Sequence, residues 1–243
     1  MKPNNCPIPT ITAVYGKEDR DFLIKEGNYP KENIVITGNQ RYDFLPERIK
    51  EYDKKEIISE LGLDDGKRTV LFITSPFSSD NNIKTLMNEI FNEISSLDNI
   101  QLIIKVHPTE NERLYEESAK RFKNLDFKVI KNKNMFELLY VSDIAITTYS
   151  TAGLEAMIMK KPLIVINLTG EDYPIDYSGD GAALRVEEKG ILRTAITHLL
   201  EHYKLKINLL KNADRYLHKH LYKVDGKAAE RIINIIENEV KEW

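Results

Sequence analysis

Short runs of β-branched and aliphatic residues alternate with longer amphipathic stretches along most of this chain. Examples are Val-Leu-Phe-Ile-Thr at residues 70–74 and Leu-Ile-Val-Ile-Asn at residues 163–167. Such alternation is typical of βα units arranged around a parallel sheet. The sequence therefore predicts the α/β class, with a doubly wound, mostly parallel sheet.

The same pattern predicts the individual elements and their division into domains. Strands are expected at residues 11–15, 34–37, 69–74, 101–106, 127–130, 144–147 and 163–167. Helices are expected at residues 17–25, 54–61, 82–97, 110–121, 135–141, 153–159, 191–203 and 227–239. Residues 40–53 read as a linker, because they hold Pro46 and mixed charges. Residues 46–243 are expected to form one domain, whereas residues 1–45 hold a strand-helix-strand piece too small for its own core.

Composition excludes several classes of protein. Among 243 residues, 35 are basic and 38 are acidic, so charge does not suggest a nucleic-acid partner. A single cysteine, Cys6, allows no intrachain disulfide and no cysteine-rich metal site. The apolar runs are far shorter than the roughly 20 residues of a membrane span. We expect a cytoplasmic protein, and association with the inner membrane surface through another domain is allowed.

The residues after the predicted strand 144–147 carry the strongest functional signal. There the chain enters a turn, Tyr149-Ser150-Thr151, and a helix begins directly after it. The first N–H groups of a helix have no intrahelical partner, so a phosphate is favoured there. Glu155 lies about one turn further on, and a carboxylate can accept two hydrogen bonds from a ribose diol. The alternative is that Ser150 or Thr151 only caps the helix and Glu155 complements its dipole.

A second signal is His107, which follows the predicted strand 101–106 and precedes Pro108. Proline fixes the backbone after the histidine, whose ring can donate to a phosphate oxygen. Ligands of open α/β sheets bind at the carboxyl ends of strands. His107 and the turn at Ser150 are therefore expected to share one nucleotide site.

These motifs resemble those of the GT-B superfamily of sugar-nucleotide enzymes. Thr-Thr-Tyr-Ser-Thr-Ala-Gly-Leu-Glu-Ala at residues 147–156, followed by Lys-Pro-Leu-Ile-Val at residues 161–165, is similar to their nucleotide-binding stretch. Residues 35–43 and 225–232 resemble the exit from their N-terminal domain and the start of their last helix. The superfamily includes UDP-N-acetylglucosamine 2-epimerases, glycosyltransferases, CDP-glycerol glycerophosphotransferases and CMP-sugar transferases.

The resemblance implies a Rossmann-like GT-B C-terminal domain preceded by a remnant of the N-terminal domain. It implies that Tyr149, Ser150 and Thr151 bind donor phosphates, Glu155 the ribose, and His107 the phosphate or sugar. The substrate would be a UDP-, CDP- or CMP-linked sugar used in cell-surface polysaccharide or glycoconjugate synthesis. No cofactor and no metal are expected. The acceptor and the catalytic residues are not identified, because the general base is expected in an N-terminal domain or partner subunit.

The resemblance also leaves alternatives open. Epimerases carry a His-Arg pair where this chain has Thr-Ser-Pro-Phe-Ser-Ser-Asp at residues 74–80, which argues against epimerase chemistry. In that loop Ser75 and Ser78 could bind the donor, or the loop could merely cap the next helix. Asp172 and Asp176 could approach the transferred sugar, with Tyr177 shaping its wall, or could belong to a solvated turn. A non-catalytic nucleotide-binding module is the alternative from another class.

Overall fold

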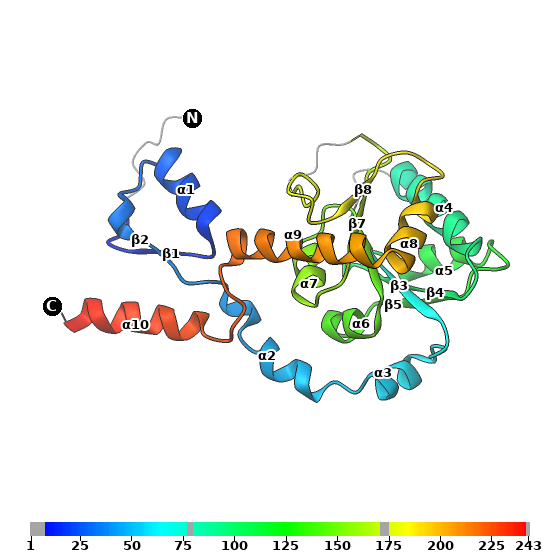
Figure 1. The fold of residues 1–243 in the computed structure, drawn as a ribbon, viewed down its shortest axis with the longest axis horizontal. Helices are drawn as coiled ribbons and strands as arrows, with labels where there is room; N and C mark the ends of the chain where they lie inside the picture. The colour runs from blue at the N-terminus through cyan, green and yellow to red at the C-terminus, as the bar shows by residue number, and fades with distance from the viewer. Residues whose placement is uncertain (1–7, 77–79, 171–174, 242–243) are drawn as a thin grey trace. The chain divides into compact units, whose positions relative to one another are not determined.

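The computed structural model describes residues 8–76, 80–170 and 175–241, and Figure 1 labels its helices and strands. The chain divides into two compact units. Unit 1 comprises Met1–Glu51 and Arg215–Trp243, and unit 2 comprises Tyr52–Asp214. The sequence analysis instead placed a boundary after residue 45 and kept the last helix in the larger domain.

Unit 2 is a six-stranded parallel sheet with helices on both faces (Figure 1). Its strands are β3 (Arg68–Ile73), β4 (Ile100–Lys105), β5 (Phe127–Ile130), β6 (Ile144–Thr147), β7 (Leu163–Ile166) and β8 (Leu184–Val186). Their order is β5-β4-β3-β6-β7-β8, and every neighbouring pair is parallel. This is the order of a doubly wound dinucleotide-binding sheet. The predicted α/β class is confirmed.

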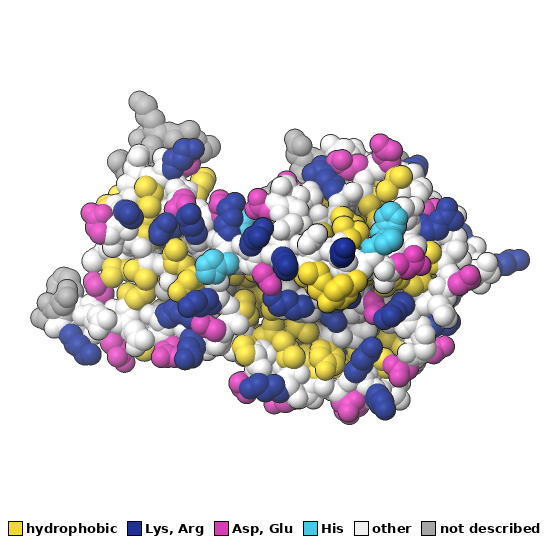
Figure 2. Space-filling model, viewed as in Figure 1, with side chains coloured by type: hydrophobic (Ala, Val, Ile, Leu, Met, Phe, Trp, Pro, Cys, Tyr) yellow, Lys and Arg dark blue, Asp and Glu magenta, His cyan; other side chains and the backbone are white. Residues whose placement is uncertain are grey.

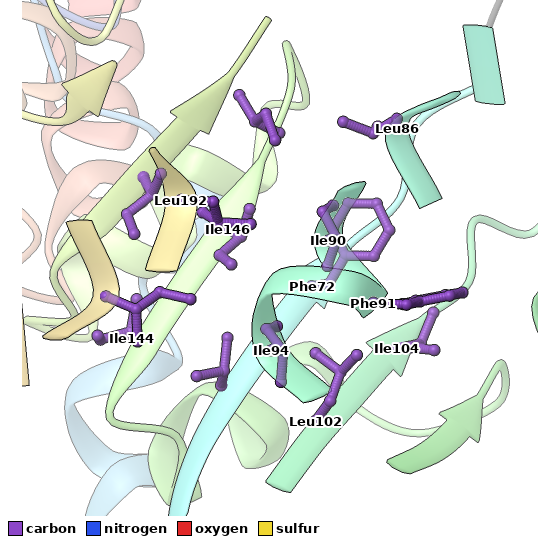
Figure 3. Close-up of a cluster of buried hydrophobic side chains, with 14 of the residues drawn as sticks. Phe72, Leu86, Ile90, Phe91, Ile94, Leu102, Ile104, Ile144, Ile146 and Leu192 are labelled. Atoms are coloured by element: carbon purple, nitrogen blue, oxygen red, sulfur yellow. The ribbon is translucent and has the colours of Figure 1, made fainter. Parts of the chain in front are cut away.

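The main core lies on one face of this sheet. Helices α4 (Asp80–Ser95), α5 (Glu112–Ala119) and α8 (Leu192–Glu201) bury their apolar sides there. Figure 3 shows Ile90 beside Phe72, Phe91 beside Ile104 and Leu192 beside Ile146.

The alternate residues of the same strands, such as Leu71 and Ala145, are also fully buried. Helices α6 (Met135–Val141) and α7 (Ala152–Ile158) contact the sheet without joining the first core, and α3 (Lys54–Leu61) contacts α6. Both faces are therefore covered, which explains why these strands read as continuous apolar runs.

Unit 1 pairs β1 (Thr12–Val14) with β2 (Ile34–Ile36) in parallel, through α1 (Lys17–Lys25). The end of α9 (Tyr203–Leu221) and α10 (Ala228–Lys241) complete the unit. The Asp43 carboxylate accepts the backbone N–H groups of Ala228 and Ala229 at 3.0 and 2.7 Å. Arg231 donates to the Thr37 carbonyl at 3.0 Å. The two segments that resemble GT-B enzymes at either end of the chain thus meet, and Asp43 caps the last helix.

Three expectations about the elements were wrong. Residues 40–53 are not a simple linker, because short helices fill most of them, namely Gln40–Tyr42, Leu45–Arg48 and Ile49–Glu51. Within these helices Tyr42 and Leu45 are buried. β8 was not expected, and α9 was not expected because the penultimate helix was predicted to end at residue 203.

Charges of both signs are interspersed on the face shown in Figure 2, as the nearly balanced composition predicts. Within the described residues, no helix has the length and apolar character needed to cross a membrane.

One partly buried cation, Lys161, is expected to make the stability of unit 2 depend on pH. Lys161 precedes β7, and its ammonium donates to the Tyr140 carbonyl at 3.0 Å. Burial lowers the pKa of Lys161 to about 8, although the charge of Asp143 opposes the shift. In the unfolded chain the pKa should be about 10.4. The unfolded state therefore binds more protons between these two values, and the free energy of unfolding should rise with pH across that window.

We expect this rise to reach at most about 3 kcal/mol, because each pKa unit corresponds to about 1.4 kcal/mol. Below the folded pKa both states are protonated, so the full cost of burying the charge is present there. Lys161→Met should abolish this part of the rise when urea denaturation is compared at about pH 7 and about pH 10. Lys123→Met, at an exposed position, should keep it. An equal rise in Lys161→Met and in the wild type would contradict the assignment.

Candidate functional site

Three predicted site segments follow neighbouring strands of unit 2. The order β4-β3-β6 places the His107 loop, the Ser75 loop and the Ser150 turn side by side at the carboxyl edge. The chain winds away in opposite directions on either side of β3 and β6, so this is the topological switch point of the sheet. Open α/β sheets bind their ligands in the crevice at such a point.

The turn after β6 is fixed mainly through Ser150. Its hydroxyl oxygen accepts the N–H of Ala152 at 3.2 Å, and its carbonyl accepts the N–H of Gly153 at 3.0 Å. Thr151 occupies the N-cap position of α7 without a side-chain cap bond, and it is exposed. The capping alternative therefore applies to Ser150 and not to Thr151, which is exposed and makes no side-chain cap bond. Because α7 has only seven residues, hydrogen bonds from individual groups of the turn should contribute more to anion binding than the helix dipole does.

Glu155 lies in the first turn of α7 and is only 6% exposed. A carboxylate that only complements a helix dipole is normally solvated, since burying an ionised group is costly without polar partners. The enclosed position of Glu155 next to the turn therefore favours a specific polar role.

Tyr149 is directed toward the neighbouring strand end. Its hydroxyl donates to the carbonyl oxygen of Pro76, in the segment that follows β3. The side chain thereby ties the turn after β6 to the loop after β3. The role of Tyr149 in phosphate binding stays a prediction.

Two buried hydroxyls lie at the ends of β3 and β6. Ser75 and Thr148 are 2% and 0% exposed, and neither hydroxyl has a hydrogen-bond partner among the residues that the structure describes. A buried hydroxyl without a partner costs about 1–3 kcal/mol, so a water molecule or a polar ligand group would satisfy it here. The sequence analysis singled out Ser75 and missed Thr148. Ser78 and Asp172 lie outside the described residues.

His107 is half-buried after β4. Its backbone N–H donates to the Thr74 hydroxyl oxygen at 2.9 Å, which joins the His107 loop to the end of β3. Its ring nitrogen Nδ1 lies 2.8 Å from the Thr109 hydroxyl. The imidazole is thus held at the edge of the crevice.

Two residues of the late loop are held by local contacts, and for Asp176 these contacts fit the alternative of a turn residue. Tyr177 is fully buried, and its hydroxyl donates to the Ser150 carbonyl at 3.0 Å. Tyr177 therefore supports the Ser150 turn from the protein interior and does not line an open pocket. Asp176 accepts the hydroxyl and N–H of Ser178 and the N–H of Gly179. Those bonds hold the pKa of Asp176 below its usual value, so Asp176 stabilises its own turn. No sequence signal pointed to Tyr177 as a support for the turn, because residue 177 is 27 positions away from residue 150.

No group of three or more His, Cys, Asp or Glu side chains within the described part of the chain could hold a metal ion.

The sequence also matches the model of a known protein family. The model of the family described as UDP-N-acetylglucosamine 2-epimerase matches residues 8–237. The chain belongs to this family. Membership agrees with the GT-B resemblance of the sequence and with the doubly wound sheet of unit 2.

Several known proteins are similar to most of this chain. The teichoic acid poly(glycerol phosphate) polymerase of Bacillus spizizenii is 22% identical over 240 residues, which cover 88% of this chain and 58% of that protein. The structure of UDP-GlcNAc 2-epimerase from Neisseria meningitidis bound to UDP-GlcNAc has a TM-score of 0.71 at 16% identity, covering 94% of this chain and 62% of the other. The wall teichoic acid polymerase TagF has a TM-score of 0.64 at 18% identity, covering 96% and 58%. This chain therefore spans between 58% and 62% of the length of these three proteins.

Proposed function

We propose that this chain is the nucleotide-binding half of a glycosyltransferase-like enzyme that uses a UDP-, CDP- or CMP-linked donor in cell-surface polymer synthesis. The observation that carries the proposal is the position of the site. His107 and the Ser150 turn follow the two strands that flank β3 at the switch point, with the enclosed Glu155 beside the turn. Hydroxyl and N–H donors suit phosphates, and a carboxylate suits a ribose diol. Teichoic acid polymerases among the relatives support the polymer class.

In this proposal the Ser150 turn stabilises the departing nucleotide. Charge develops on the phosphate oxygens as the bond to the transferred group breaks. In this proposal the hydroxyls of Ser150 and Thr151 and the His107 ring donate to them. Donors fixed before the reaction lower its barrier because they need no reorganisation.

Calorimetric titration with UMP, CMP, UDP and CDP tests the binding site. We expect at least one nucleotide to bind, and we expect Ser150→Ala and Glu155→Ala each to weaken binding by about 10- to 100-fold, the loss of one charge-assisted contact. Ser59→Ala and Glu117→Ala are matched controls at exposed helix positions and should bind as the wild type does. Failure of all four nucleotides to bind the wild type would refute the proposal.

We also propose that the general base lies outside this chain, on a further α/β domain. The relatives are longer than the matched region. Among its described residues, unit 1 has two strands, and such a pair is marginally stable alone. An open apolar groove of about 400 Å³ lies between β1 and α10, next to Ile11, Ile232 and Ile236. Ile236 is 56% exposed. A domain that extends this small sheet would cover the groove.

Turnover assays separate the candidate activities. The chain alone should release no nucleotide from UDP-, CDP- or CMP-sugars above background, because the base is absent. Release of nucleotide would contradict this requirement and would also exclude a non-catalytic module. Family membership makes epimerisation of UDP-GlcNAc the second candidate. Conversion to the 2-epimer by the chain would favour that activity, despite the missing His-Arg pair.

A further inference from the structure

The ring of His107 is held through one nitrogen. The backbone N–H of Thr109 donates to Nδ1 at 3.3 Å, and the Thr109 hydroxyl lies 2.8 Å from the same atom. A backbone N–H can only donate, so Nδ1 must present a lone pair. A neutral imidazole with a lone pair on Nδ1 carries its proton on Nε2.

We propose that Thr109, Thr74 and Glu110 form a positioning network that holds His107 as the Nε2–H tautomer, so that Nε2 donates a hydrogen bond into the crevice at the sheet edge. The role of that donor in binding a nucleotide phosphate rests on the proposed function. The tautomer and the network do not depend on it.

The second part of the network fixes the backbone of His107. Its N–H donates to the Thr74 hydroxyl oxygen at 2.9 Å, and its carbonyl accepts the N–H of Glu110 at 2.9 Å. The Thr74 hydroxyl donates its own proton to the Glu110 carboxylate. This donation orients a lone pair of the Thr74 oxygen toward the His107 N–H. Glu110 thus acts on His107 through Thr74, as a positioning residue.

Glu110 is itself held from two sides. The hydroxyl of Tyr115, which is only 1% exposed, donates to the other carboxylate oxygen at 2.7 Å. Burial, reinforced by Glu110, raises the pKa of Tyr115 far above its usual value, so this hydroxyl stays a donor. The Lys131 ammonium donates to the Glu110 carbonyl at 2.7 Å. The Glu110 carboxylate therefore joins the end of β3 to α5, and its backbone carbonyl is tied to the segment after β5.

A simpler interpretation is that these bonds only stabilise the loop after β4. The two interpretations differ in how ligand binding depends on phosphate. In a purely structural network, loss of Glu110 would lower the melting temperature without a phosphate-specific effect on binding.

Long-range ¹H–¹⁵N NMR spectra of the intact chain near neutral pH test the ring state. The His107 signals are assigned by their disappearance in His107→Gln. We expect nitrogen shifts of a single Nε2–H tautomer for His107 in the wild type, and increased Nδ1–H population in Thr109→Val. A predominant Nδ1–H form in the wild type would overturn the inference, and no change in Thr109→Val would overturn the part assigned to the Thr109 hydroxyl.

Titration with UDP, CDP, uridine and cytidine tests the positioning role. Glu110→Ala should weaken diphosphate binding about tenfold and leave nucleoside binding unchanged, while Glu110→Gln should restore most of the loss. Equal weakening of nucleotide and nucleoside, or no recovery in Glu110→Gln, would contradict the role of Glu110. If neither diphosphate binds the wild type, the titration is repeated with UMP and CMP; failure of all four nucleotides refutes the proposed function, and the NMR result still decides the tautomer.

Discussion

Gly16→Ala is expected to destabilise unit 1 by about 3 kcal/mol or more, at the upper end of the cost of overpacking. A Cβ at Gly16 would lie 2.4 Å from the Lys219 carbonyl oxygen and 2.5 and 2.6 Å from the carbonyl carbon and oxygen of His220. All three atoms belong to the backbone at the end of α9, so no side-chain rotation relieves the clash. Gly16 is also the N-cap residue of α1, where its N–H donates to Asp19 at 3.2 Å. Displacing it should disturb α1 and α9 together.

Hydrogen exchange measured by mass spectrometry checks this result region by region. Protection should fall across residues 12–36 in Gly16→Ala and stay close to the wild type in the strands of unit 2. Gly66→Ala is the control, because a Cβ there would meet only the Asp64 carboxylate, at 3.2 Å on an exposed loop. Wild-type protection of residues 12–36 in Gly16→Ala would contradict the prediction, because it would show that α9 can move aside without lowering the stability of unit 1.

Gly153→Ala is expected to weaken nucleotide binding on the order of 100-fold, the equivalent of about 2.7 kcal/mol, and to lower the free energy of unfolding by about 1–3 kcal/mol. A Cβ at Gly153 would lie 2.5 and 2.8 Å from two ring carbons of Tyr177. The ring cannot yield easily, because Tyr177 is fully buried and its hydroxyl holds the Ser150 carbonyl. The turn that contains Ser150 should move instead.

Two further variants separate the steric effect from the lost hydrogen bond. Tyr177→Phe removes only the bond to Ser150, and the expected loss of nucleotide affinity is smaller, about tenfold. Tyr177→Leu combined with Gly153→Ala makes room for the new methyl group and should recover part of the affinity lost in Gly153→Ala. Calorimetry with the nucleotide that binds the wild type provides the measurement. Unchanged nucleotide affinity in Gly153→Ala would contradict the inference that Tyr177 supports the Ser150 turn.

The central strands were predictable because burial on both faces leaves no polar alternation. β3, β4, β6 and β7 each appear in the sequence as an apolar run, and each was expected within a residue or two of its observed bounds. β8 was missed because it has only three residues and its middle one, Arg185, is exposed. α9 was missed because basic and polar side chains cover most of its length.

The loops of the candidate site were predictable because ligands gather at strand carboxyl ends, which the strand predictions locate. The contacts between those loops were not. Thr74 meets His107 because β3 and β4 pair with Ile73 opposite Lys105, and a sequence does not reveal such a register. Tyr177 reaches Ser150 from a loop on the far side of β7. Tertiary packing alone brings these residues together.

The Asp43 cap on α10 has a consequence for how the protein forms during synthesis. Residues 52–214 make up one unbroken stretch and can fold as soon as they leave the ribosome, since domains emerge and fold as units from the amino end. Unit 1 cannot be completed until α10 has been synthesised. Asp43 binds the N–H groups of Ala228 and Ala229, which lie 185 and 186 positions later in the chain. Contacts so distant in sequence form slowly. The early strands are therefore exposed to chaperones and proteases throughout translation of the larger unit.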